Sequence, residues 1–103
     1  MSYSYLLRSI ASLEFIDAFV WYEEQQDGLG EIFNAAVTHK LRQICNNPFH
    51  YKKSYRNFHE ALTEKFPFLI VYLVDEKSQL IIVIAIFHTS RSPRGKFKPT
   101  RLK

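Results

Sequence analysis

Two groups of basic side chains, each with a histidine, are the residues of this sequence best suited to chemistry. Cations neutralise phosphate groups, and an imidazole accepts or donates a proton near neutral pH. The groups comprise Lys52, Lys53, Arg56 and His59, followed by His88, Arg91 and Arg94. They predict a surface that binds phosphate, with His88 and Arg91 as the catalytic candidates if that surface cuts RNA.

Tyrosines accompany these cations, which is typical of surfaces that bind RNA. Tyr55 lies within the first group, and antiparallel pairing of the strands would bring Tyr72 near both groups; aromatic rings stack on unpaired bases. Cleavage of RNA needs one group to take the proton of the 2′-hydroxyl and another to protonate the leaving oxygen, and His59 and His88 are suited to either role. Antiparallel strands would bring both groups to one rim of a sheet. The alternative is ordinary surface charge around a hairpin.

Other chemistries lack their usual sequence signals. The four histidines are scattered, there is no glycine-rich phosphate loop, and the single cysteine, Cys45, excludes a disulfide framework. We expect Cys45 to be a small buried side chain, because free cysteine is among the most buried residue types. The sequence therefore predicts no metal and no cofactor.

Length and charge indicate one small domain with a basic end. The chain has 103 residues, of which 47% are hydrophobic and 16% aromatic, enough for one core. Residues 1–86 carry eight Lys and Arg against ten Asp and Glu, whereas residues 87–103 carry six Lys and Arg and no acid. We expect a single domain over residues 1–93 and a flexible basic tail over 94–103.

The sequence shows no signal for export or for a membrane. Its first residues lack the apolar stretch of a signal peptide. The longest uninterrupted apolar run, Leu80–Phe87, has eight residues, against the roughly 20 that a spanning helix needs. We expect a cytoplasmic protein with no membrane partner.

The elements that must position the candidate residues form a β-α-α-β-β-β pattern. The pattern predicts an α+β fold, with a helix hairpin packed on a mostly antiparallel sheet. Ser9 is the expected N-cap of the first helix, and Gly28 the left-handed residue that ends it. The expected strands are Tyr3–Ser9, Phe58–Glu64, Phe68–Val74 and Leu80–Phe87, and the expected helices are Ile10–Gln26 and Gly30–Asn46.

The first helix is apolar on two sides, so it must pack against two things. One stripe contains Phe15 and Phe19, and a second, roughly opposite, contains Leu13, Ile16 and Val20. A sheet can cover only one of these stripes. The other predicts contact with the second helix or with a partner protein.

Three blocks of this sequence resemble the RelE/ParE toxins of type II toxin–antitoxin systems. The blocks follow the order of that superfamily and cover about Ser9 to Pro93. They are Trp21–Gly30 with Phe33 and Asn47-Pro48, then Phe58–Phe68 with Ile70-Val71-Tyr72, and finally Ala85–Pro93, which contains a His-x-x-Arg-x-Pro ending. The resemblance implies a small toxin that an acidic antitoxin holds inactive.

The resemblance leaves the target open between two mechanisms. RelE-like members cut mRNA in the ribosomal A site, whereas ParE-like members inhibit DNA gyrase without nuclease residues. The ending from His88 to Pro93 is closer to the ParE-like pattern, and the chain lacks the tyrosine that RelE-like nucleases often carry near the C-terminus. Glu60 stands where many relatives carry arginine, which also counts against a nuclease.

We therefore expect a ParE-like inhibitor of gyrase that arrests growth and stabilises plasmids. A ribosome-dependent mRNA endonuclease is the alternative, and a non-toxic module that only binds antitoxin is the second alternative. We expect the antitoxin to pack an amphipathic helix on Ile16, Phe19 and Val20, with an added strand at a sheet edge as a further contact. Its acids would meet a basic rim comprising Lys52, Lys53, Arg91 and Arg94.

Overall fold

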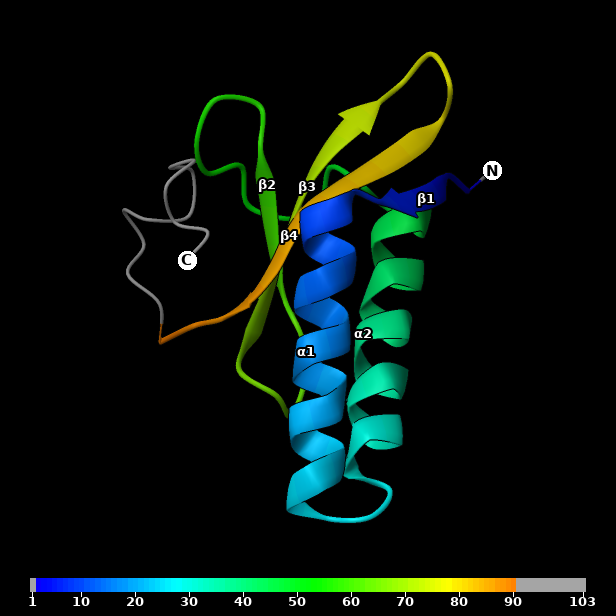
Figure 1. Cartoon of the computed structure of the whole chain (residues 1–103). Coiled ribbons are helices and arrows are strands. Elements are labelled where there is room, and N and C mark those ends of the chain that lie inside the picture. The colour runs from blue at the N-terminus through cyan, green and yellow to red at the C-terminus, as the bar shows by residue number, and fades with distance from the viewer. Residues whose placement is uncertain (1, 91–103) are drawn as a thin grey trace.

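The computed structural model describes residues 2–90 and shows the expected order of elements (Figure 1). The fold is α+β, as the sequence predicts. The elements are β1 (Ser4–Leu7), α1 (Ser9–Gln25), α2 (Leu29–Asn46), β2 (His59–Leu62), β3 (Phe68–Asp75) and β4 (Leu80–His88). In the part of the chain that is described, no helix is long and apolar enough to cross a membrane.

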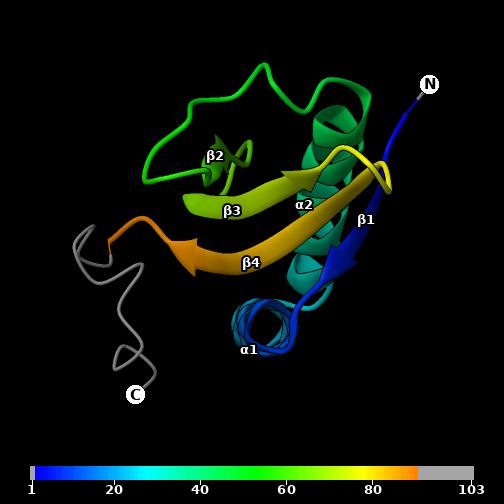
Figure 2. The same cartoon turned by 90° about the horizontal axis from the view of Figure 1, so that it is seen from above.

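The four strands form one mixed sheet in the order β1-β4-β3-β2. The β2–β3 and β3–β4 pairs are antiparallel, and β1 lies parallel to β4 at one edge. The two helices run side by side as an antiparallel hairpin against one face of this sheet (Figures 1 and 2). This confirms the predicted helix hairpin on a mostly antiparallel sheet.

A cluster of aromatic rings joins the hairpin to the sheet. Phe33 of α2 is completely buried, and its ring lies 5.6 Å from Phe15 and 5.2 Å from Tyr22 of α1. On the other side the same ring lies 5.3 Å from Phe66 and 5.0 Å from Phe68. Burial of one such ring stabilises a fold by about 1.5–3 kcal/mol, so this cluster fixes where the helices rest on the sheet.

The turn between the helices depends on two glycines and one carboxylate. Gly28 has a φ of 88°, in the left-handed region that was expected for it. It precedes α2 directly, and α1 ends earlier, with Gln26 as its C-cap. Glu23 accepts hydrogen bonds from the backbone N–H groups of Gly28 and Gly30, both at 2.9 Å, and so caps the start of α2.

The start of α1 differs from the sequence prediction. Ser9 is the first helical residue, and the N-cap is Arg8, which makes no capping hydrogen bond through its side chain. The prediction of Ser9 as N-cap is therefore wrong. Because β1 leads into the helix after a single residue, backbone pairing decides this boundary: the N–H of Arg8 donates to the carbonyl oxygen of Val83 in β4 at 3.0 Å.

A β-bulge interrupts the pairing of the two central strands. Val71 pairs with Ala85 and Tyr72 with Val83, so Ile84 is an extra residue in β4. Val83 before the bulge and Ile86 after it are both fully buried in the core that the helices cover. Strict alternation along β4 would place these two residues on opposite faces.

Candidate functional site

His88, the leading catalytic candidate, ends β4 and is half-buried. It pairs with Phe68 on β3. The two ring centroids are 5.4 Å apart, and the angle of 79° between the ring planes makes this an edge-to-face contact. The backbone N–H of Ser90 donates to Nδ1 at 3.0 Å, and the Ser90 hydroxyl lies 2.9 Å from the same nitrogen. Nδ1 therefore acts as an acceptor, which places the ring proton on Nε2, the nitrogen left to meet a partner.

His59 and Tyr72 lie inside the protein, where they stack on each other. Their ring centroids are 5.2 Å apart, with 16° between the planes. His59 is 7% exposed, and its Nδ1 lies 3.1 Å from the carbonyl oxygen of Tyr51, to which it donates in the matching tautomer. Tyr72 has no exposed surface, and its hydroxyl donates to the carbonyl oxygen of Pro48 at 2.7 Å.

This burial gives both residues a packing role. Burial is also the main cause that raises the pKa of the Tyr72 hydroxyl above its ordinary value of 10.0, with the nearby Tyr51 as a smaller cause. A ring with no exposed surface does not stack on a base in this conformation. The placement of Tyr72 and His59 therefore does not fit their predicted direct contact with RNA.

The register of the sheet separates the two histidines. His59 of β2 pairs with Tyr72 of β3, whereas His88 of β4 pairs with Phe68, four residues earlier on β3. Four residues of strand span about 13 Å, and the two histidines also lie on opposite sides of β3. The expected single rim that would hold both histidines is not formed.

The cations of the first group lie on the connector between α2 and β2. Lys52, Lys53 and Arg56 are exposed, and the guanidinium of Arg56 lies 5.2 Å from the centre of the Tyr55 ring. The connector is held against the outer edge of β2, because Lys53 forms a β-bridge with His59 and the N–H of Glu60 donates to Lys52. Figure 2 shows this connector at the β2 edge, with β1 at the other end of the sheet.

The second group is described only at its first member. Arg91 and Arg94 lie outside the described residues, as does the whole predicted tail over 94–103. Among residues 2–90, no three His, Cys, Asp or Glu side chains gather as metal ligands would. Cys45 is buried as expected, and desolvation raises the pKa of its thiol.

The outer surface of α1 carries an exposed apolar stripe, here called the α1 stripe: Ile10, Leu13, Ile16 and Val20. These side chains are 41% to 61% exposed. Phe19 lies on the other side of the helix, half-buried against the core, with its ring 6.2 Å from that of Phe15. Of the three residues predicted to bind the antitoxin, Ile16 and Val20 are therefore on the surface.

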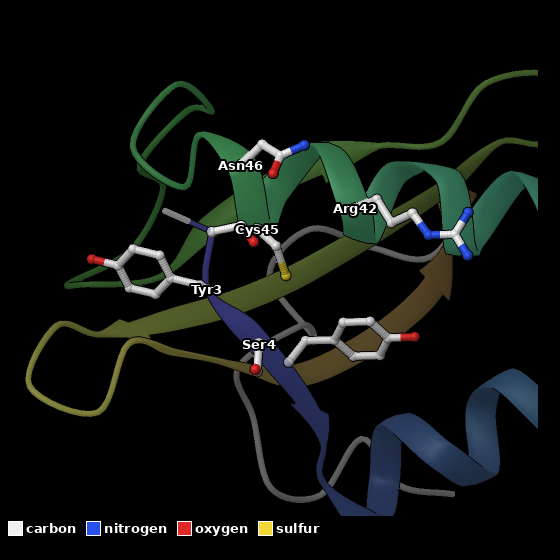
Figure 3. A pocket seen from close by; sticks show the side chains of 7 residues that line it. Tyr3, Ser4, Arg42, Cys45 and Asn46 are labelled. Carbon is white, nitrogen blue, oxygen red and sulfur yellow. The ribbon is translucent and has the colours of Figure 1, made fainter.

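A depression at the end of the hairpin where α1 begins and α2 ends was not predicted from the sequence. It has a volume of about 490 Å³ and lies between β1 and the last turn of α2. Figure 3 shows the Cys45 sulfur directed from α2 toward the sheet, with Tyr3 and Ser4 on β1 and Arg42 one turn earlier on the helix. Its walls come from segments 40 residues apart in the chain, so spacing along the sequence gives no signal of it.

Solved structures place this arrangement in the class of RelE/ParE toxin folds. One is the chromosomal ParDE system from P. aeruginosa, with a TM-score of 0.66 and 14% identity over 84% of this chain and 96% of the other. The intact E. coli RelBE toxin–antitoxin complex matches with a TM-score of 0.65 and 15% identity, over 87% of this chain and 100% of the other. The RelBE2 toxin–antitoxin complex from Mycobacterium tuberculosis matches with a TM-score of 0.60 and 12% identity, over 85% of this chain and 99% of the other.

The family model described as the ParE toxin of type II toxin–antitoxin system, parDE, matches residues 5–93. The chain belongs to this ParE toxin family, as a type II toxin of the RelE/ParE superfamily. A search of curated proteins finds no significant match.

Proposed function

We propose that this toxin acts in the cytoplasm by the ParE-like route and inhibits DNA gyrase. The observation that carries the proposal is the separation of His88 from His59 and Tyr72. Acid–base cleavage of RNA needs two proton-transfer groups within hydrogen-bond reach of one phosphodiester. Over residues 2–90, the His88 ring makes its polar contacts with Ser90, while His59 is buried about 13 Å along the sheet.

In this proposal His88 and the connector cations are contact residues. In this role Nε2 of His88 donates a hydrogen bond to the target, and Lys52, Lys53 and Arg56 attract an acidic or phosphate-bearing surface. Contact residues need exposure but not mutual proximity, which is the arrangement that the sheet register provides.

A ribosome-dependent mRNA endonuclease is the second candidate, and the connector favours it. Exposed cations beside an aromatic ring, as in the pair of Arg56 and Tyr55, suit a single-stranded nucleic acid. In this case His88 is the acid or base, and Arg91 and Arg56 stabilise charge on the phosphate. A non-toxic module that only binds antitoxin is the third candidate.

Induced expression in a bacterium, followed by assays with purified gyrase, separates the three candidates. We expect growth arrest with an SOS response, and loss of supercoiling when the purified toxin is added to gyrase. Arrest with mRNA cut in the reading frame and active gyrase would overturn the proposal in favour of the nuclease. Normal growth would favour the binding module.

A histidine substitution distinguishes contact from catalysis. His88→Ala should weaken gyrase inhibition by less than about tenfold, whereas loss of an acid or base costs about 10²-fold or more in rate. His39→Ala is the matched control, because His39 is an exposed histidine on α2. A loss of 10²-fold or more in His88→Ala alone would contradict a contact role.

We also propose that the partner is an acidic antitoxin whose amphipathic helix covers the α1 stripe and whose next segment pairs with β1. The backbone of Ser4 and Arg8 faces β4, since their N–H groups donate to Gln79 and Val83. By alternation, the backbone groups of Tyr5 and Leu7 face away from the sheet. The connector occupies part of the β2 edge, so β1 is the edge more suited to an added strand.

This docking is tested with the protein encoded by the adjacent reading frame. Ile16→Glu should weaken its binding by about tenfold or more, because it places a charge in an apolar contact. Ile32→Glu is the control, since Ile32 is 49% exposed on α2, outside the stripe. Salt should slow association more than it speeds dissociation. Equal effects of the two substitutions, or a complex that dissociates in moderate salt, would contradict the proposed docking.

A further inference from the structure

The bulge in β4 decides which face of the sheet His88 occupies. Before it, Ile81 and Val83 point to the helices; after it, Ile86 and His88 do so, because the extra residue Ile84 shifts the alternation by one. A strand with strict alternation would place His88 and Val83 on opposite faces. The orientation of His88 therefore depends on whatever holds the bulge in place.

The second half of β4 loses its neighbour on the β1 side. β1 pairs with β4 from Leu80 to Val83 and ends at Leu7, after which the chain turns into α1. Past the bulge, Ile86 lies opposite Ile70, and its N–H points away from β3 toward the side where β1 would continue. A strand edge that continues beside an apolar helix leaves such a donor without a backbone partner.

Glu14 of α1 supplies the missing acceptor. Its Oε1 accepts a hydrogen bond from the N–H of Ile86 at 2.7 Å, across 72 residues of sequence. Ile86 is fully buried and Glu14 is partly buried, and a carboxylate that accepts from a backbone N–H makes one of the stronger hydrogen bonds in proteins. One side chain of the helix thus supplies the acceptor that a longer β1 would have offered beyond Arg8.

We propose that Glu14 is a positioning residue that holds the bulged end of β4 and thereby directs the His88 imidazole. Ile86 and His88 are two residues apart on one strand face, so a fixed Ile86 fixes the direction of His88. The Phe68 ring and Ser90 then set the tilt and the tautomer of the imidazole. The consequence for toxicity rests on the contact role proposed for His88; the positioning itself does not.

Nuclear magnetic resonance of the full-length chain tests this role directly. In the unmodified protein, the Ile86 amide should exchange slowly with solvent although no strand of residues 2–90 pairs with it on that side. In Glu14→Met, which keeps the volume but removes the acceptor, Ile86 exchange should accelerate by about tenfold or more. The ¹⁵N shifts of the His88 ring should then move toward a mixture of the two tautomers.

Two further variants make the result specific. Glu14→Gln keeps an acceptor oxygen, so it should restore slow exchange of Ile86 and the Nε2–H tautomer of His88. Glu24→Met is the matched control, because Glu24 is an exposed glutamate of the same helix. If Glu14→Met does not fold, rapid Ile86 exchange in Glu14→Gln or in the unmodified protein would still overturn the inference.

The outcomes separate this inference from the proposed function. Unchanged His88 shifts and unchanged Ile86 exchange in a folded Glu14→Met protein would overturn the positioning role. Altered shifts with undiminished toxicity, together with a fully toxic His88→Ala, would uphold the positioning role and remove His88 from the proposed site. Altered shifts with weakened gyrase inhibition would support both.

Discussion

Tyr72→Phe removes one buried hydroxyl and leaves the rest of its surroundings in place. The hydroxyl donates to the carbonyl oxygen of Pro48 at 2.7 Å, and this bond ties the end of α2 to the centre of the sheet. The phenylalanine ring should keep its stacking on His59, so the loss is confined to the hydrogen bond. A buried acceptor left without its donor costs about 1–3 kcal/mol, and we expect this loss in the free energy of unfolding at pH 7.

The same substitution has a distinct signature at alkaline pH. Burial holds the pKa of Tyr72 above 10.0 in the folded state, whereas the unfolded chain titrates near 10.0. Unfolding therefore releases a proton above pH 10. The stabilising contribution of Tyr72 is complete below pH 10 and falls by about 1.4 kcal/mol per pH unit as the pH rises toward the folded-state pKa. Tyr72→Phe has no such loss, so its stability should converge on that of the unmodified protein.

Denaturant unfolding at pH 7 and at several values from pH 9 to 11 measures both effects. Tyr5→Phe is the matched control, because Tyr5 is 41% exposed and should give less than about 0.5 kcal/mol at every pH. A Tyr72→Phe protein as stable as the unmodified chain at pH 7, with the same alkaline decline, would refute the reasoning. It would mean that the hydroxyl is hydrated in solution.

Three other substitutions test the helix hairpin and its buried lysine. Gly30→Ala should lower the free energy of unfolding by about 1–2 kcal/mol, because the new Cβ would lie 2.9 Å from the Phe19 carbonyl oxygen. This steric clash should outweigh the gain in helix propensity. An unchanged thermal midpoint would contradict the prediction. Glu23→Ala removes the side chain that caps α2, so it should lower the free energy of unfolding, measured with denaturant, by about 1–2 kcal/mol. Glu24→Ala, the control, should lower it only slightly. Equal losses in the two variants would argue against capping. Lys40→Met should change stability by less than about 1 kcal/mol, because the ion pair of Lys40 is 4.0 Å long with an exposed carboxylate; a larger calorimetric loss would show a stronger pair.

The order and type of the elements follow from local features of the sequence. Each element is specified by residues that lie close together in the sequence. These segments are a 17-residue helix without glycine or proline, a link that contains glycine, and two apolar runs rich in β-branched residues. The exposure of Ile16 and Val20 follows as well, because a helix with two apolar stripes cannot bury both against one sheet. The left-handed backbone of Gly28 is similarly local, since glycine meets no steric penalty there.

Lys40 marks an intermediate case. It lies on α2 next to the buried Val37 and Leu41, and its side chain is mostly buried, with its ammonium 5.4 Å from the centre of the Tyr51 ring. The sequence offered no way to choose that ring, because the connector reaches α2 only through the folded arrangement.

The surface available for chemistry was decided by the tertiary structure. Histidine and tyrosine at positions 59 and 72 are suited equally to a binding surface and to a core, and only the pairing of β2 with β3 buries them against each other. The bulge that directs His88 lies in a continuous apolar run, where the absence of alternation hides an inserted residue. The strand register pairs segments that are far apart in the chain, so it depends on the packing of the whole sheet and its helices. A short stretch of sequence therefore cannot predict it.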